Sequence, residues 1–192
     1  INQYDERSRV PHLRGCINDI QGMQSYLEGR VATDDFNLHL QVLTDAQATR
    51  QGIIDGFERH LSQASSDDVA LFYYAGHGAQ AKAPEVFWRT SPDQMMETLV
   101  CYDSRIDDEH WDLADKELAQ LIAQVDAEQP HIVVILDCCH SGSGTREISA
   151  NDAAAVATRK AGIDYRDRPL DSFLLGSADA PSMFSSEPEK AG

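Results

Sequence analysis

The sequence lacks the features that mark several large classes of protein. It has no run of about eighteen apolar residues, and it does not begin with a basic segment followed by an apolar one. Neither a membrane span nor a signal peptide is therefore predicted. Basic residues are scarce, with 16 Lys and Arg against 32 Asp and Glu, for a formal net charge of −16. This charge opposes binding to nucleic acid or anionic membranes and favours binding to basic peptides. The alternative interpretation is that the negative charge only keeps the protein soluble.

Cysteine is scarce too. The four cysteines show no CxxC spacing, and two of them are adjacent: Cys16, Cys101, Cys138 and Cys139. This pattern suits neither a disulfide framework nor a zinc knuckle. We therefore expect a reducing, cytoplasmic setting. With 192 residues, 42% of them hydrophobic, the chain is long enough to form one globular domain with a real core.

Apolar residues recur at helical spacing in three segments. They predict helices over about 17–29, over a segment that Thr49 caps, and over a segment that Asp115 opens. Apolar runs at 69–74 and 131–136 predict strands covered on both faces, and the alternation at 36–42 predicts a strand with one covered face.

The remaining segments carry weaker patterns. Residues 79–100 are expected to be mostly loop with a short strand, 143–169 to be an exposed linker, and 172–176 to be a last strand. Because strands and helices alternate, we predict an α/β sandwich with a mostly parallel sheet flanked by helices. Catalytic groups gather beyond the carboxyl ends of the strands in such sheets.

Two clusters of chemically active residues follow the two most apolar predicted strands. Ala75-Gly-His-Gly78 follows one, and Asp137-Cys-Cys-His-Ser-Gly142 follows the other. An imidazole beside a thiol lowers the thiol pKa and later protonates the leaving amine, so His77 and Cys139 are candidates for base and nucleophile. The backbone N–H groups of Gly78 and Cys139 are candidates for an oxyanion hole.

Other interpretations of these clusters are open. A lone cysteine after a strand is usually a packing residue, and a histidine between glycines is often a polar loop residue. It is the joint occurrence at two strand ends that favours catalysis. A zinc site is also possible in composition, but adjacent ligands cannot easily point at one tetrahedral ion; its ligands would be His77, Cys138, Cys139 and His140.

The strings Tyr73-Tyr-Ala-Gly-His-Gly78 and Asp137-Cys-Cys-His-Ser-Gly142 closely resemble the histidine and cysteine motifs of metacaspases and their prokaryotic relatives among the caspase-like cysteine peptidases. Leu13–Asp19 and Glu97–Asp103 resemble two further segments of that family. The resemblance covers roughly residues 1–180. It implies a single caspase-like catalytic domain over 1–192, with a large-subunit region at 1–142, an exposed linker at 143–169 and the start of a small-subunit region at 170–192.

The same resemblance assigns roles position by position. It makes Cys139 the nucleophile, since Cys139 directly precedes His-Ser-Gly, and it makes His77 the general base, with Cys138 a bystander. It implies a substrate-binding pocket lined by two acids, with a thiol and a small residue beside them: Asp19, Asp137, Cys16 and Ala75. Cleavage after Arg or Lys follows, because two partly desolvated carboxylates prefer a cation to an aspartate. Asp19 has a second interpretation, as a favourable anion in the first turn of a helix.

Many metacaspases are activated by calcium through several acids. Asp103 and Asp115 fit that pattern, but Lys116 and Arg146 stand where the resemblance leads us to expect further acids. Hard cations need several oxygen ligands, so we predict no cofactor and no calcium activation.

Family members are often cut in the linker, and this one carries several basic residues there: Arg146, Arg159, Lys160, Arg166 and Arg168, with Lys190 near the end. Self-cleavage after one of them is expected, and an ordinary flexible charged loop is the alternative. The resemblance also leads us to expect the family's first strand and a companion C-terminal fragment outside the given residues.

The main hypothesis is an endopeptidase that cleaves proteins or peptides after Arg or Lys with a Cys-His dyad, possessing no nucleic-acid or membrane partner. A caspase-fold interaction module that has lost activity is the alternative, which retention of both His77 and Cys139 disfavours. An enzyme with one dedicated protein target is a third possibility that sequence cannot separate from a general peptidase.

Overall fold

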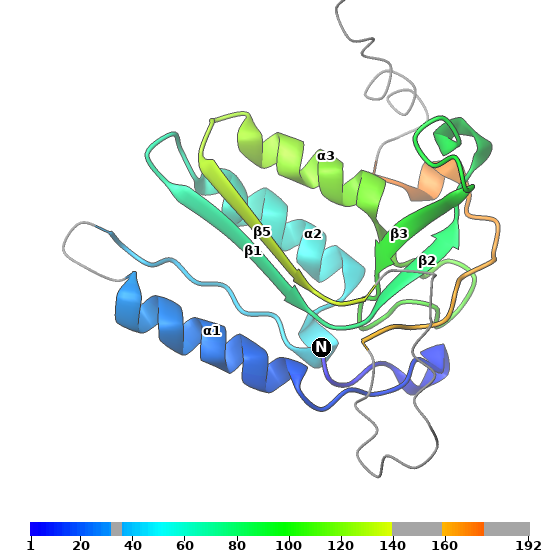
Figure 1. Ribbon diagram of the computed structural model, residues 1–192, viewed down its shortest axis with the longest axis horizontal. Helices are drawn as coiled ribbons and strands as arrows, with labels where there is room; N and C mark the ends of the chain where they lie inside the picture. Colours follow the sequence, from blue (N-terminus) through cyan, green and yellow to red (C-terminus); the bar gives the residue numbers. More distant parts are fainter. Residues whose placement is uncertain (32–35, 140–158, 175–192) are drawn as a thin grey trace, which may run out of the picture.

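The computed structural model describes residues 1–31, 36–139 and 159–174. At its centre lie two parallel strands, β1 (Val69–Ala75) and β5 (His131–Asp137), which confirms both predicted apolar strands (Figure 1). Their register runs from Val69 opposite His131 to Ala75 opposite Asp137. The segments that follow β1 and β5 therefore start from the same edge of the strand pair.

Helices cover both sides of this pair. α1 (Cys16–Arg30) lies on one side, and α2 (Arg50–Arg59) and α3 (Asp115–Asp126) lie on the other (Figure 1). All three predicted helices are confirmed, and Thr49 caps α2 by accepting a hydrogen bond of 2.9 Å from the N–H of Gly52. The result is the predicted α/β sandwich of helix, parallel strands and helix.

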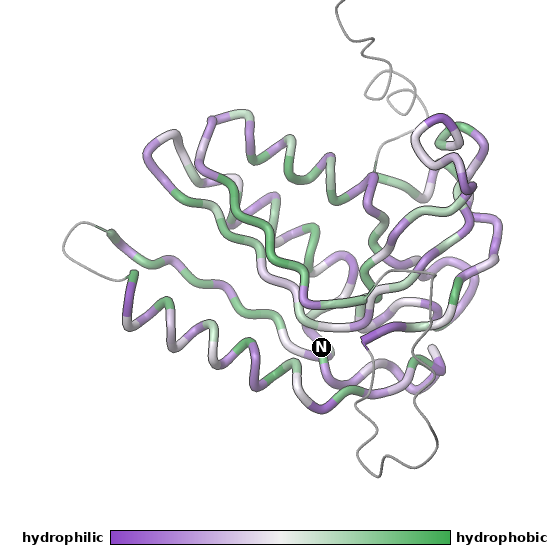
Figure 2. The backbone as a smooth tube through the Cα atoms, in the orientation of Figure 1, coloured by the Kyte–Doolittle hydropathy of each residue, from purple (hydrophilic) through white to green (hydrophobic). Residues whose placement is uncertain are grey.

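The core fills the space between the layers. In Figure 2 the apolar stretches follow β1 and β5 and alternate with polar ones along the helices. α2 contributes Ile53, Ile54 and Phe57 to this core, and the rings of Phe57 and Phe72 lie 4.8 Å apart. Within the described part of the chain, no helix is both long and apolar enough to cross a membrane.

A small antiparallel sheet lies beside this centre, where the sequence analysis expected mostly loop with one short strand over 79–100. It has the order β2 (Gly78–Lys82), β3 (Met95–Leu99) and β4 (Leu113–Ala114). β2 reads Gly-Ala-Gln-Ala-Lys, and its buried positions carry only glycine and alanine, so its hydrophobic alternation is weak. Short 3₁₀ turns complete the described structure: η1 (Glu6–Ser8), η2 (Asp45–Gln47), η3 (Leu61–Gln63), η4 (Glu85–Phe87) and η5 (Leu170–Ser172).

Three further expectations need correction. Residues 36–42 alternate as predicted but form no strand, and Phe36, Leu40 and Val42 are exposed, because nothing in the described residues pairs with them. β1 and β5 are not covered on both faces, since Val69 is 56% and Leu136 39% exposed. Residues 172–174 form the end of η5 and a turn rather than a strand, and 175–176 lie outside the described residues.

The predicted exposed linker at 143–169 is packed where the structure describes it. Lys160 and Asp164 form parallel bridges to Gly78 and Ala81 of β2. Ala161, Asp164 and Arg168 are buried. The prediction of exposure fails there because backbone pairing with β2, which local composition does not reveal, covers the segment.

Candidate active site

His77 lies in a tight bend directly after β1 and is only 2% exposed. Its backbone N–H donates to the hydroxyl of Tyr4 at 2.8 Å, and its carbonyl accepts from the hydroxyl of Tyr74, also at 2.8 Å. A Cβ on Gly76 would meet the Tyr74 hydroxyl at 2.5 Å, so no side chain fits at that position. The bend is thus fixed by two tyrosines and requires a glycine before the histidine.

The environment of the His77 ring defines its tautomer. Nε2 lies 2.8 Å from the carbonyl oxygen of Pro11, which can only accept, so Nε2 carries the proton. Nδ1 is buried, and none of the described residues offers it a hydrogen bond. Burial lowers the pKa of His77, while its hydrogen bond to Pro11 acts in the opposite sense. The ring therefore has a neutral form with a free basic nitrogen.

Cys138 and Cys139 follow β5 but differ in exposure. Cys139 is exposed, whereas Cys138 is half-buried and burial raises the pKa of its thiol to about 12. Because Ala75 is paired with Asp137, His77 and Cys139 each stand two residues beyond the last paired position of their strands. The register places both residues at the same edge of the strand pair, and the roles of Cys139 as nucleophile and Cys138 as bystander stay predictions.

The two predicted oxyanion donors converge on a single oxygen. The N–H groups of Gly78 and Cys139 each donate a hydrogen bond of 3.0 Å to the backbone carbonyl of Arg159. Two N–H donors on one carbonyl are the arrangement that stabilises a developing oxyanion. The backbone of Arg159 also lies close to the His77 ring and, like that of Pro11, acts against the lowering of the His77 pKa by burial.

The side chain of the same residue joins the two predicted pocket acids. The guanidinium of Arg159 forms ion pairs with Asp19 at the start of α1 and with Asp137 at the end of β5, and Nη1 also donates to the Asp137 carbonyl at 3.3 Å. A Cβ at Gly15 would lie 3.4 Å from Nη2, so a side chain at that position would crowd the guanidinium. The acids thus bind one planar cation between them.

The other predicted pocket residues lie beside these acids. Cys16 is fully buried; burial raises the pKa of its thiol, whereas the charge of Arg159 acts to lower it. Ala75 is 2% exposed and is the β1 partner of Asp137. Tyr73 donates to Asp137 at 3.4 Å. Cys16 is thus close enough to Arg159, Asp19 and Asp137 to feel their charges, and Ala75 adjoins Asp137 in the strand pair.

The acids considered for calcium have other partners. Asp103 accepts a hydrogen bond of 2.9 Å from the N–H of Arg50, the first residue of α2. Asp115 pairs with the ammonium of Lys116 at 2.8 Å. In the described ranges, no three His, Cys, Asp or Glu side chains are grouped to hold a metal, and Arg146 and His140 lie outside those ranges.

Sequence reasoning missed Tyr4 and Pro11 and did not single out Arg159. The Tyr4 hydroxyl and the Pro11 carbonyl both accept hydrogen bonds from His77, and no local motif in the sequence marks such contacts. Arg159 stood among several basic residues of the linker, 140 positions from Asp19. Two facing carboxylates signal that a cation is needed, but they do not tell which one.

A basic histidine and an exposed thiol at the ends of two parallel strands, with an acidic pocket beside them, define the class of caspase-like α/β domains. Comparison with known proteins leads to the family. The model of the metacaspase peptidase C14 domain matches residues 1–146. The chain therefore belongs to the metacaspase family.

Individual relatives agree with this assignment. The chain is 32% identical over 137 residues to metacaspase-1 of Mycosarcoma maydis, which covers 68% of this chain and 32% of that protein. It is 30% identical over 151 residues to metacaspase-1 of Sclerotinia sclerotiorum, covering 74% and 32%. The alignments thus span about a third of these relatives. The solved structure of protein GSU0716 from Geobacter sulfurreducens is similar with a TM-score of 0.57 and 26% identity, over 74% of this chain and 48% of that one.

Proposed function

We propose that the protein is a cysteine endopeptidase that cleaves after Arg or Lys. The single observation that carries the proposal is the placement of Arg159. Its guanidinium bridges Asp19 and Asp137, while its carbonyl oxygen accepts from the N–H groups of Gly78 and Cys139. A residue bound at once through a charged side chain and an oxyanion-type pair is in the position of the residue before a scissile bond.

The proposed chemistry uses the free nitrogen of His77. Nδ1 removes the proton of Cys139, and the thiolate attacks the substrate carbonyl, whose oxygen gains negative charge opposite the N–H groups of Gly78 and Cys139. The carbon–nitrogen bond breaks, and the imidazolium donates its proton to the leaving amine. Water then hydrolyses the thioester and restores the thiol. The Pro11 carbonyl, 2.8 Å from Nε2, supports the ring orientation and stabilises the imidazolium.

The pocket chemistry supports basic specificity. Asp19 and Asp137 approach one guanidinium from two elements, which suits the planar fork of arginine, and a lysine ammonium satisfies the same charges as a point cation. An aspartate at this position would meet two like charges. We further propose that the protein processes itself after a basic residue of its linker, that it needs no calcium, and that it acts in the cytoplasm, where its thiol stays reduced.

The test compares two adjacent cysteines. Fluorogenic peptides that present Arg, Lys or Asp at the cleavage position are incubated with the full chain, with Cys139→Ala and with the matched control Cys138→Ala. We expect hydrolysis of the Arg and Lys peptides, a loss of at least about a thousandfold in Cys139→Ala, and near-normal rates in Cys138→Ala. Activity that survives in Cys139→Ala but disappears in Cys138→Ala would refute the assignment, as would a preference for Asp.

A further inference from the structure

We propose that Glu97 binds a basic side chain on the residue directly after the scissile bond, the leaving residue, so that the protein prefers to cut between two basic residues. This inference rests on the proposed function and adds a second specificity-determining residue to the same site. Glu97 lies in β3 opposite Gln80 of β2, whose side-chain amide donates to Oε1 at 3.1 Å. The other oxygen, Oε2, is buried, and no donor among the residues that the structure describes forms a hydrogen bond with it.

A buried carboxylate oxygen without a hydrogen bond is unfavourable, so it marks a position where a donor is expected to bind. An ionised carboxylate can only accept, and cationic donors form the strongest hydrogen bonds with it. Nδ1 of His77 is another buried atom without a partner in the described residues, and the proposed chemistry gives it a function. The same chemistry gives none to Glu97, although Glu97 belongs to the same part of the molecule.

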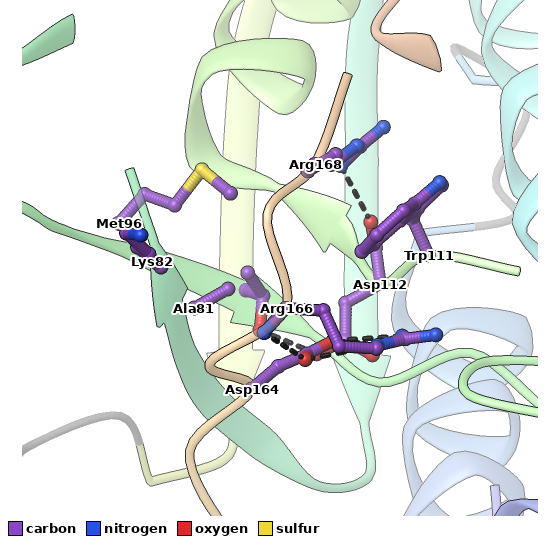
Figure 3. A pocket seen from close by; sticks show the side chains of 9 residues that line it. Ala81, Lys82, Met96, Trp111, Asp112, Asp164, Arg166 and Arg168 are labelled. Atoms are coloured by element: carbon purple, nitrogen blue, oxygen red, sulfur yellow. Dashed lines mark hydrogen bonds and ion pairs between the residues drawn. The ribbon is translucent and has the colours of Figure 1, made fainter. Parts of the chain in front are cut away.

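The basic residues on the far side of the small sheet do not supply this donor. In Figure 3, Arg166 and Arg168 lie with Ala81 and Met96 around a small cavity. Successive residues of a strand point to opposite faces, so Glu97, which follows Met96 in β3, points away from this cavity. Both arginines also have acidic partners of their own. The donor that Glu97 lacks must therefore come from the other face of the sheet.

That other face lies beside the proposed reaction centre. Burial is the main cause of the raised pKa of the Cys138 thiol, and the charge of Glu97 adds to it, so the carboxylate lies near the residue that precedes Cys139. Gly78, one of the two predicted oxyanion donors, stands two positions before Gln80 in β2. Residues two apart in a strand belong to the same face, so the face of Gln80 and Glu97 begins at the oxyanion donor.

The backbone at Arg159 shows in which direction a bound chain continues. The Arg159 carbonyl accepts from the N–H groups of Gly78 and Cys139, and the next residue, Lys160, forms a parallel bridge to Gly78. Paired residues of neighbouring strands point to the same face of a sheet. A substrate that binds in this direction therefore presents the side chain of its leaving residue on the face that carries Glu97.

The charge of Glu97 decides which leaving residues suit this face. A lysine or arginine supplies the missing donor together with a positive charge, whereas an alanine leaves Oε2 without a partner. An aspartate or glutamate sets two carboxylates against each other. We therefore expect Arg–Lys bonds to be cut fastest, Arg–Ala bonds more slowly and Arg–Glu bonds slowest.

The experiment uses the full 192-residue chain and peptides with a fixed Arg followed by Lys, Ala or Glu. Mass spectrometry identifies the bond that is cut, and an Arg-aminomethylcoumarin peptide, which has no leaving residue, reports on the rest of the site. In the parent chain, kcat/KM should be about tenfold or more higher for the Arg–Lys than for the Arg–Glu peptide. Glu97→Gln should reduce this ratio to within about threefold and change coumarin hydrolysis by less than about twofold. All rates are repeated in the Arg159→Gln background, where the two pocket acids are free for the peptide.

Two further variants separate the local carboxylate from other causes. Glu58→Gln removes the same charge from an exposed position of α2 and should keep the parental ratio, although it changes the net charge of −16 equally. Gln80→Lys places a cation beside Glu97 within the chain and should lower the ratio as Glu97→Gln does, since the carboxylate is then occupied. This variant keeps the experiment decisive should Glu97→Gln not fold.

The outcomes distinguish this inference from the proposed function. If the parent chain hydrolyses the coumarin peptide but cuts Arg–Lys and Arg–Glu bonds at similar rates, the peptidase stands and the role of Glu97 falls. The role also falls if the preference survives in both Glu97→Gln and Gln80→Lys, or if folded Glu97→Gln loses coumarin and peptide hydrolysis equally. If the parent chain hydrolyses no substrate and an Arg-directed covalent thiol probe fails to label Cys139, the proposed function itself falls.

Discussion

Asp19 and Asp137 bind a guanidinium, whereas Asp103 and Asp115 are engaged by groups of the scaffold itself. The side chains of Asp19 and Asp137 are 39% and 44% exposed, come from α1 and β5, and face the same cation. Asp103 instead accepts from the backbone of Arg50, and Asp115 is paired with its neighbour Lys116. All four are aspartates, so residue type alone does not separate a binding pair from a structural one.

The two pairs of carboxylates differ in how much of their hydrogen-bonding capacity is left for a ligand. A carboxylate that already accepts from a helix N–H contributes to folding and has less capacity for a foreign cation. A carboxylate that faces a second carboxylate across a partly exposed gap needs a cation, and in this structure Arg159 supplies one. We therefore expect Asp19 and Asp137 to control catalysis, and Asp103 and Asp115 to control stability.

The largest expected effect comes from removing the charges of the binding pair. Asp19→Asn and Asp137→Asn should each lower kcat/KM for Arg peptides by roughly ten- to a hundredfold, since a hydrogen bond between charged groups contributes about 1.5–3 kcal/mol. The double variant should lose more than either single one. Steady-state kinetics with the linker already cut, or with Arg159→Gln as the background, isolates this effect.

Asp103→Asn is the matched control, with the same loss of one charge in the other pair. It should leave kcat/KM for Arg peptides within about twofold of the parent. An equal loss in Asp103→Asn and Asp19→Asn would remove the distinction between the two pairs. It would also favour the interpretation of Asp19 as a helix-terminal anion alone.

Part of this comparison was predictable from the sequence. The helices and the two central strands follow from apolar periodicity, and the site follows from motifs that stand at strand ends, where the observed register indeed places them. The expectation that Asp19 and Asp137 share a pocket came from family resemblance, and both now contact one guanidinium. Periodicity is a local property, so it serves best where an element buries its own apolar face.

The parts that sequence did not reveal depend on contacts between distant segments. Only one short strand was expected over 79–100, and β2 could not be located there because Ala79 and Ala81 are buried without forming a strong apolar alternation. Residues 36–42 alternate well but form no strand, so periodicity without a partner was insufficient. The packing of residues 159–168 requires β2 to exist first. Because β2 was not located, residues 159–168, which pair with it and pack beside it, were predicted to be an exposed linker.

An intermediate effect is expected from the structural pair. Asp103→Ala removes the acceptor for the first N–H of α2 and should lower the free energy of unfolding by about 1 kcal/mol. The KM for Arg peptides should not change. Urea denaturation followed by circular dichroism measures this, with the exposed Asp67→Ala as the matched control. Equal stability of Asp103→Ala and Asp67→Ala would show that the Asp103 contact contributes nothing to the helix.

The smallest effect is expected from calcium. Ca²⁺ needs about six to eight oxygen ligands, and Asp103 and Asp115 already have protein partners, with the Lys116 ammonium 2.8 Å from Asp115. A nearby cation opposes the entry of another, so removing calcium should change the rate on Arg peptides by less than about twofold. Turnover is measured after exhaustive chelation, after calcium is restored, and with an equal concentration of magnesium as the control for ionic strength. If chelation abolishes turnover and calcium but not magnesium restores it, the acids assigned here to structure also bind a cation, and the contrast between the two pairs is lost.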